Sequence, residues 1–317
     1  MIVFFQVLFR VLTSSDLWQA TLQFGALLLL PALGGVISER SGVTNIAMEG
    51  MMLTGAYAGV MTALSTHSLL VGVLGAIIAG GLMALIHAVV SINFKANQIV
   101  SGIAINIAAL GLTNYLLFVQ TGGQGVPSLA SSLRLPTVTW GPLAKIPFLG
   151  PVLFQQNIIF YVALLVLVGI QLLLFRTNIG LRIRAVGEHP QAADTAGVNV
   201  RLVRYLCVVS SGLLSGLAGA FLALGIAGIF LPNMTAGIGY IALAAVIFGK
   251  YIPLGAAGAC LIFGLGEALS VRLQDTNISP NLLSTLPYIL TLIALVGLVG
   301  RTTPPAADGI PYEPGAE

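Results

Sequence analysis

Long apolar stretches dominate the sequence, and short breaks rich in glycine, proline and polar residues separate them. A helix needs about 20 apolar residues to cross a hydrocarbon layer of ~30 Å, whereas a strand of a membrane barrel alternates over about 10 residues. The pattern therefore predicts an all-α fold, a polytopic bundle of transmembrane helices. We expect about eight or nine spans, near 17–38, 43–63, 68–92, 98–119, 156–176, 202–230, 237–250, 252–272 and 282–300.

Composition agrees with a membrane protein and narrows the possible functions. Hydrophobic residues make up 57% of the chain and charged residues 7%, against roughly 25% charged residues in soluble domains. Because lipid offers no hydrogen-bond partners, such a chain has little room for a soluble catalytic domain. We expect one transmembrane domain over residues 1–300, beginning with a retained interfacial or partial helix, and a tail over residues 301–317.

The sequence contains no motif of a common catalytic or metal site. It has no G-x-x-x-x-G-K-S/T loop for phosphate, no H-E-x-x-H and no paired Cys and His ligands. Cys207 and Cys260 lie inside apolar runs and are expected to be small buried residues. His67 and His87 are expected to face packing contacts or interfaces. We therefore expect no catalytic residue, metal or cofactor on this chain.

Basic residues predict how the chain crosses the membrane. The segment between the fifth and sixth spans is flanked by five of the 13 Lys and Arg residues: Arg176, Arg182, Arg184, Arg201 and Arg204. Positively charged loops stay on the cytoplasmic side. Alternation from this segment places Glu39, Arg40 and the tail on the cytoplasmic side, and the Gly/Pro-rich loop 120–151 outside.

A weak internal repeat suggests a transporter. Residues 69–112 resemble residues 253–298 at a constant offset, which pairs Gly72 with Gly255 and Leu82 with Leu265. An odd number of spans between the copies makes them run in opposite directions. Inverted repeats with broken helices are common in transporters, although Gly/Ala/Leu-rich helices can also align by chance.

Each half of the chain contains one broken segment. The first is "VISERSGVTNIAMEGMML", residues 36–53, and the second is "PNMTAGIGYIALAAVIFG", residues 232–249. In the first, Gly42 is expected to break the helix, and Glu39 and Arg40 are expected to neutralise one another. Short helices opened by glycine and polar residues at corresponding places indicate a translocation path.

Polar side chains near these breaks are candidates to line the path. A carboxylate at membrane depth costs on the order of 3 kcal/mol, so Glu49 needs an interior partner or a water-filled cavity. A helix starting near residue 44 would place Asn45 and Glu49 on one face. Alternatively, Glu49 pins one helix to another through backbone N–H groups, and the amides hold helices together. The predicted path residues are Asn45, Glu49, Gln98, Ser101, Asn106 and Tyr240.

The segment "RIRAVGEHPQAADTAGVNVRLVR", residues 182–204, predicts a short helix outside the membrane. Pro190 suits a first helical turn, Glu188 favours the positive end of that helix, and Gly197 suits the position after its end. We expect a helix over residues 189–196. A short rigid helix in a cytoplasmic loop is a docking element, and the alternative is an ordinary solvated loop.

Several separated motifs resemble one family. "SERSGVTNIAMEGMMLTGAYAG", "ANQIVSGIAINIAALGLT", "GEHPQAADTAGVNV", "MTAGIGYIALAAVIFGKYIPLGA" and the tail "PYEPGAE" occur in this order. Together they look like the inner-membrane permease of ABC importers for nucleosides and simple sugars, a group related to ribose and branched-chain amino-acid permeases.

The resemblance implies partners that the sequence does not contain. The coupling loop 177–201 would dock on a separate ATPase that holds ATP and Mg²⁺, through Gly187, Glu188, His189, Pro190, Ala193 and Gly197. A second permease chain, related or identical, and an extracytoplasmic substrate-binding protein would complete a transporter in the bacterial plasma membrane. Nucleosides are the first expected substrates and ribose-like sugars the next; no nucleic acid is expected. The rival hypothesis is an ion-coupled carrier that uses Glu49 or Glu267 to move protons.

Overall fold

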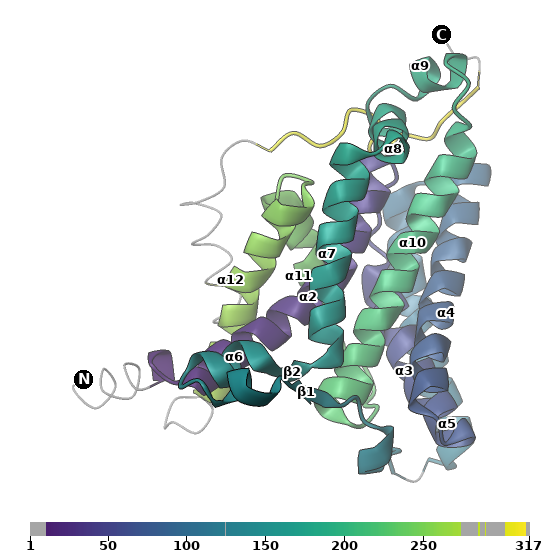
Figure 1. Cartoon of the computed structure of the whole chain (residues 1–317). Helices are drawn as coiled ribbons and strands as arrows, with labels where there is room; N and C mark the ends of the chain where they lie inside the picture. The colour runs from purple at the N-terminus through teal and green to yellow at the C-terminus, as the bar shows by residue number, and fades with distance from the viewer. Residues whose placement is uncertain (1–10, 124, 274–284, 286–288, 290–301, 315–317) are drawn as a thin grey trace.

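The computed structural model describes residues 11–123, 125–273, 285, 289 and 302–314. Its bundle is built from α2 (Ser15–Arg40), α3 (Met48–Thr66), α4 (Leu69–Ala88), α5 (Gln98–Thr121), α7 (Ile158–Arg176), α10 (Val200–Ala220), α11 (Ile238–Phe248) and α12 (Pro253–Arg272). Six of the described helices are long and apolar enough to cross a membrane. The predicted all-α bundle is confirmed, and Figure 1 shows its helices running between two ends of the molecule.

The observed helices agree with most predicted spans and differ at the breaks. α3 begins at Met48 instead of near residue 43, while α11 is as short as predicted. Two helices continue as π-helical segments, η1 (Val89–Asn93) after α4 and η4 (Phe221–Ala227) after α10. Except for residues 285 and 289, the predicted span 282–300 and the end of the second repeat copy lie outside the described residues, so the inverted repeat stays a prediction.

Polar side chains fix where several helices begin. Ser14, Asn97, Asn157 and Asn199 each accept a hydrogen bond from a backbone N–H in the first turn of the helix that follows. These N–H groups have no partner within a helix, so a side-chain oxygen satisfies them and determines the first residue of the helix. The amide of Asn97 therefore caps α5.

The predicted irregular loop between α5 and α7 contains short elements. They are η2 (Ser131–Leu133), strand β1 (Thr137–Thr139), η3 (Gly141–Lys145), α6 (Leu149–Phe154) and strand β2 (Gln155–Asn157). β1 and β2 pair antiparallel, with Thr137 opposite Asn157. The N–H of Leu135 donates to the carbonyl of Leu224 at 2.9 Å, which ties the loop to η4.

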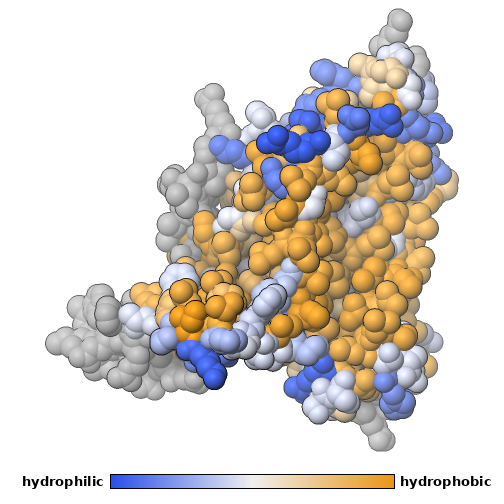
Figure 2. Space-filling view, in the orientation of Figure 1, coloured by the Kyte–Doolittle hydropathy of each residue, from blue (hydrophilic) through white to orange (hydrophobic). Residues whose placement is uncertain are grey.

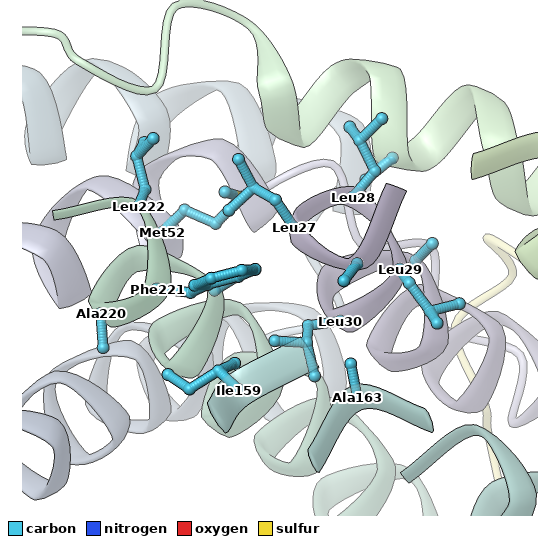
Figure 3. Packing of buried hydrophobic residues seen from close by; sticks show 14 of the residues in the cluster. Leu27, Leu28, Leu29, Leu30, Met52, Ile159, Ala163, Ala220, Phe221 and Leu222 are labelled. Atoms are coloured by element: carbon cyan, nitrogen blue, oxygen red, sulfur yellow. The ribbon is translucent and has the colours of Figure 1, made fainter. Parts of the chain in front are cut away.

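The largest apolar core surrounds α2. Leu27, Leu30 and Leu33 of this helix are at most 1% exposed, and Phe221 at the start of η4 is fully buried. Figure 3 shows Phe221 and the α2 leucines near Ile159 and Ala163 of α7. Cys207 and Cys260 are free and buried in this cluster, as predicted.

Small residues bring α4 and α10 into backbone contact. A Cβ atom added at Gly80 would meet the carbonyl oxygen of Gly212 and lie 2.7 Å from Cα of Gly216. Gly212 and Gly216 form a G-x-x-x-G pair, the spacing with which helices pack closely in membranes, where apolar burial does not drive association. Close packing of backbones therefore holds this side of the bundle together.

The surface has an apolar belt between two polar ends. Figure 2 shows orange side chains over the middle of the bundle and blue ones mainly near the α8–α9 end and the opposite end. Large apolar side chains in the belt are strongly exposed, including Leu165 at 73% and Ile107 at 67%. A belt of this kind faces lipid or other membrane helices, so the chain is a multi-pass membrane protein.

Candidate functional site

A pocket of about 250 Å³ lies where the N-terminal ends of α3 and α11 meet the middle of α5. Three predicted path residues line it: Glu49 from α3, Asn106 from α5 and Tyr240 from α11. Tyr240 is 45% exposed, so the pocket opens at the protein surface. The structure brings these three residues together, and their part in transport stays a prediction.

The carboxylate of Glu49 lies between the first turns of two helices. Its Oε1 accepts a hydrogen bond from the N–H of Gly237 at 2.9 Å, and its Oε2 accepts one from the N–H of Gly239 at 2.6 Å. Glu49 belongs to the first turn of α3, and the two glycines lie at the start of α11. Helix N-termini carry partial positive charge and stabilise an anion. This geometry supports the alternative in which Glu49 pins two helices together.

The amide of Asn106 connects the same three helices. Its Oδ1 accepts from the N–H of Gly50 at 2.8 Å, and its Nδ2 donates to the carbonyl of Ile46 at 3.0 Å and to Tyr240 Oη at 2.9 Å. The Tyr240 hydroxyl keeps its own proton for another acceptor. The pocket can therefore bind an uncharged molecule that carries hydroxyl groups.

Asn45 does not share a helical face with Glu49, and this prediction was wrong. α3 begins at Met48, because the Asn45 side chain holds the preceding backbone in a turn: its Oδ1 accepts from the N–H of Ala47 at 3.1 Å. Such local bonds compete with helix formation. The Asn45 Nδ2 donates to Ser211 Oγ of α10 at 2.8 Å, so the side chain is used in packing.

Gln98 and Ser101 also hold the non-helical segment 41–47 and do not line the pocket. Gln98 Oε1 accepts from the N–H of Thr44 at 2.7 Å. Ser101 Oγ lies 3.0 Å from His87 Nδ1, and His87 Nε2 lies 3.1 Å from the carbonyl oxygen of Thr44. Buried backbone that is not helical needs such partners inside a membrane protein. These residues shape the pocket wall indirectly.

Sequence reasoning missed part of this arrangement. The N–H groups of Gly237 and Gly239 bind the carboxylate, yet glycine carries no chemical signal of its own. His87 was assigned only to packing or interfaces, although it bridges Ser101 and Thr44. The signal that could have identified His87 as a hydrogen-bonding residue was its position as a polar side chain inside an apolar run.

At the opposite end from β1 and β2, the chain between α7 and α10 folds into two short helices (Figure 1). α8 spans Asn178–Glu188, and α9 spans Pro190–Thr195 with Pro190 at its first position. Gly197 follows with φ +83°, a left-handed conformation that favours glycine. The predicted helix over residues 189–196 is therefore present, and the rules for proline and glycine located it.

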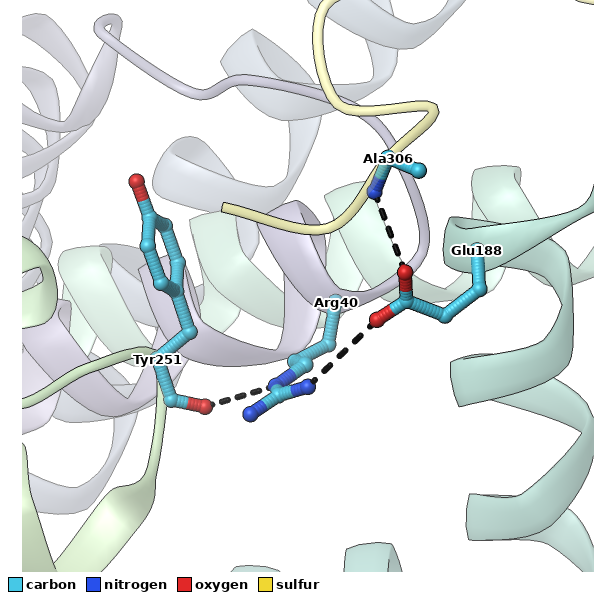
Figure 4. Close-up of polar contacts among 4 residues, drawn as sticks. All are labelled: Arg40, Glu188, Tyr251 and Ala306. Atoms are coloured by element: carbon cyan, nitrogen blue, oxygen red, sulfur yellow. Dashed lines mark hydrogen bonds and ion pairs between the residues drawn. The ribbon is translucent and has the colours of Figure 1, made fainter. Parts of the chain in front are cut away.

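Glu188 and Arg40 join this loop to the end of α2 (Figure 4). Glu188 Oε1 lies 3.9 Å from Arg40 Nη1, and Glu188 Oε2 accepts from the N–H of Ala306 at 3.2 Å. Arg40 Nε donates to the carbonyl of Tyr251 at 2.8 Å. The expected neutralisation of Glu39 by Arg40 was wrong, because Arg40 points to Glu188 across the helix ends.

The remaining loop residues divide into packed and exposed positions. A Cβ atom added at Gly187 would overlap the backbone carbonyl of Arg40, so only glycine permits this approach. The carbonyl of Gly187 accepts from the N–H of Ala307 at 2.8 Å. Ala193 is 5% exposed, whereas His189 is exposed. α9 therefore has one face against the protein and one face free.

The tail residue Asp308 lies half-buried beside this loop. Burial raises the pKa of its carboxyl to about 6, against the opposing effects of hydrogen bonds from Thr44 and Gly309 and of the positive charge of Arg204. Thr44 Oγ1 donates to Asp308 Oδ1 at 3.0 Å. Glu39 and Tyr251 also interact electrostatically with Asp308. Its ionisation is therefore linked to docking of the tail.

We expect docking of the tail to weaken as the pH rises. The raised pKa means that the docked carboxyl holds its proton more tightly, so this stabilisation is complete below the ordinary pKa of 3.8 and is lost as the pH rises through about 6. Asp308→Asn should remove this dependence and strengthen docking at pH 7.5 by up to about 3 kcal/mol. Rates of proteolysis within the tail between pH 5 and 8 measure it; the same pH dependence in both proteins would contradict it.

Among the residues that the structure describes, no three His, Cys, Asp or Glu side chains are grouped to hold a metal ion. Glu267 lies in α12 and is not among the pocket-lining residues. Polar chemistry at the pocket is thus supplied by amides, a hydroxyl and one carboxylate that is already hydrogen-bonded.

A surface pocket between broken helices, inside an apolar belt, is the arrangement of a membrane permease. Residues 18–295 match the family described as the permease component of branched-chain amino acid transport systems, and the chain belongs to this family.

Individual relatives agree with this assignment. The chain is 42% identical over 309 residues to the guanosine ABC transporter permease protein NupQ of Bacillus subtilis, covering 92% of this chain and 95% of NupQ. It is 37% identical to the nucleoside ABC transporter permease protein NupC of Lactococcus lactis, covering 90% and 92%. It is also 29% identical to the guanosine ABC transporter permease protein NupP of Bacillus subtilis, covering 75% and 69%.

A solved structure supports the fold. An inward-facing conformation of an ABC transporter aligns with a TM-score of 0.50 at 16% identity, covering 89% of this chain and 85% of that one. At this identity the likeness concerns the fold alone.

Proposed function

We propose that this chain is the permease subunit of an ABC importer that carries nucleosides, or related simple sugars, across the bacterial plasma membrane. The observation that carries the proposal is the connection between the α8–α9 loop and the broken helices through Arg40 and Glu188. An ATP-driven importer needs such a connection. The names of NupQ and NupC, relatives that transport guanosine and nucleosides, support the substrate class.

The substrate passes the pocket formed by Glu49, Asn106 and Tyr240. Asn45, Gln98 and Ser101 contribute by holding the segment before α3. An amide and a hydroxyl on the wall suit an uncharged, hydroxylated ligand, because they can exchange hydrogen bonds with it without a buried charge.

The α8–α9 end faces the cytoplasm and docks on a separate ATPase, which binds ATP and Mg²⁺ and hydrolyses the nucleotide. The five arginines that flank this loop support the orientation. The docking element consists of Gly187, Glu188, His189, Pro190, Ala193 and Gly197. The exposed face of α9 is available to the ATPase.

The transporter contains a second permease chain that is related but not identical, with a homodimer as the alternative. NupQ and NupP are two guanosine permease proteins of one organism, and this chain resembles both, NupQ more closely. An extracytoplasmic binding protein delivers the substrate and sets much of the specificity. Nucleic acid has no part in this function.

A proton-coupled carrier fits the pocket less well. Both oxygens of Glu49 accept hydrogen bonds from backbone N–H groups. Both oxygens are thus used to join α3 to α11, which supports a positioning role for Glu49 over the role of a mobile carrier.

Replacing residues 190–197 with a Gly/Ser linker of equal length is expected to lower ATP-driven nucleoside uptake at least 10-fold. A flexible linker lacks the proline and glycine that fix α9, so motion of the ATPase no longer reaches the helix bundle. Uptake and ATP hydrolysis are measured in proteoliposomes that contain the whole transporter with its binding protein.

The matched control replaces η3, Gly141–Lys145, an exposed short helix at the opposite end, with a Gly/Ser linker of five residues. It should keep the number of substrate molecules transported per ATP. Full uptake by the 190–197 variant would exclude coupling through α9 and favour the ion-coupled carrier.

A further inference from the structure

The C-terminal tail, residues 302–314, lies against the α8–α9 loop. The N–H of Ala306 donates to Glu188 Oε2 at 3.2 Å, and the N–H of Ala307 donates to the carbonyl of Gly187 at 2.8 Å. Both acceptors belong to the last turn of α8. The tail is therefore attached to the loop through its backbone, at positions where the side chains are small.

The tail residues that follow Ala307 contact the segment before α3 and helix α10. Asp308 Oδ1 accepts from Thr44 Oγ1 at 3.0 Å, and the carbonyl of Ile310 accepts from Arg204 Nη1 at 2.9 Å. Thr44 belongs to the segment 41–47 that precedes α3, and Arg204 belongs to α10 and is 1% exposed. The tail thus connects α8 to the broken segment beside the pocket.

Tyr312 places an aromatic ring inside the loop itself. It is 7% exposed and packs in one cluster with Val186 of α8, Ala193 of α9 and Val200 of α10. Its hydroxyl also interacts electrostatically with Asp194 of α9. The cluster is small, so removal of one ring deprives α9 of much of its apolar support.

We propose that the tail is a working part of the coupling apparatus, in which Tyr312 holds α9 and Asp308 holds segment 41–47, so that displacement of α9 reaches the start of α3. This inference rests on the proposed ATP-driven function. Tyr312 and Asp308 are positioning residues, because neither lines the pocket. The tail can transmit a displacement because it contacts α9 through Tyr312 and segment 41–47 through Asp308.

Tyr312→Ala is expected to lower the number of substrate molecules transported per ATP at least 5-fold, while the ATPase still co-purifies and hydrolyses ATP. Tyr312→Phe keeps the ring and should stay within 2-fold of the wild type. Glu313→Gln is the control, because Glu313 is exposed and pairs only with the surface residue Lys95 among the described contacts. A merely structural role would lower assembly, uptake and ATP hydrolysis together.

A second variant tests the link without removing the ring. Thr44→Cys with Asp308→Cys loses the 3.0 Å hydrogen bond, and both native cysteines are buried away from reagents. We expect the reduced double variant to couple poorly and a short bifunctional thiol reagent to restore coupling to within 2-fold of the wild type. Normal coupling in the reduced form, or loss of transport on cross-linking, would overturn the proposal.

The two proposals fail in different ways. If the linker variant of residues 190–197 transports normally, the ATP-driven function itself is wrong. If that variant fails while Tyr312→Ala keeps the wild-type ratio of transport to ATP hydrolysis, only the role of the tail is wrong.

Discussion

Glu49→Ala is expected to lower nucleoside uptake at least 100-fold. The substitution leaves the N–H groups of Gly237 and Gly239 without an acceptor at the start of α11. Each buried unsatisfied backbone group costs about 1–3 kcal/mol, so the first turn of α11 loses about 2–6 kcal/mol. The pocket then loses one of its three walls. Uptake in proteoliposomes and hydrogen exchange of the α11 amides measure the two effects.

Glu49→Gln and Glu267→Gln serve as companions to this variant. Glutamine keeps one acceptor oxygen and turns its NH₂ group toward the other N–H, so we expect a loss of roughly 10-fold. The pH profile of uptake should keep its shape, because the proposed ATP-driven importer couples no proton to transport. Glu267 does not line the pocket, and Glu267→Gln should stay within 2-fold. Wild-type uptake by Glu49→Ala would show that the pathway lies elsewhere.

Local sequence rules were enough to locate most helices. Spans with long apolar runs and a polar cap, such as α5 and α7, were predicted to within two residues at each end. Pro190 and Gly197 located α9 because proline fixes φ at the first helical position and glycine tolerates the left-handed conformation beyond the last turn. Features that depend on one residue's own conformation can be predicted from a single sequence.

The partners of the polar residues could not be predicted in the same way. Glu49 was identified as an acid that needs an interior partner. The donors to its carboxylate are the N–H groups of Gly237 and Gly239, which lie 188 and 190 residues further along the chain. Asn45 was assigned to the helical face of Glu49 because a helix starting near residue 44 would bring the two together, yet the Asn45 side chain holds a turn instead. Long-range packing and side-chain competition decided both cases.

The docked structure of the tail was the feature least predictable from the sequence. Its residues show no helical or strand periodicity, and the hydrogen bond between Thr44 and Asp308 spans 264 residues. A polar C-terminal segment is usually solvated, so docking of Tyr312 follows only from the completed fold of α8, α9 and α10. The tail motif "PYEPGAE" resembles the family, but no physical rule predicted from it where the tail docks.

Gly216→Val is expected to destabilise the helix bundle strongly. A Cβ atom at this position would overlap the backbone carbonyl of Ala76 and lie 3.2 Å from Cα of Gly80, both in α4. Neither backbone can move without separating the helices, and overpacking of this kind costs about 3 kcal/mol or more. The melting temperature of the purified protein should fall by roughly 6–12 °C.

Gly169→Val is the matched control, because Gly169 lies inside α7 and a Cβ atom there meets nothing within 4 Å. Both variants place a β-branched residue in a membrane helix, so the difference between their melting temperatures isolates the contact between α4 and α10. Gly216→Ala should give an intermediate fall, since its single methyl group already overlaps the Ala76 carbonyl. Equal melting temperatures for Gly216→Val and Gly169→Val would mean that α4 and α10 can separate without loss, and close backbone packing would not be what holds this side of the bundle.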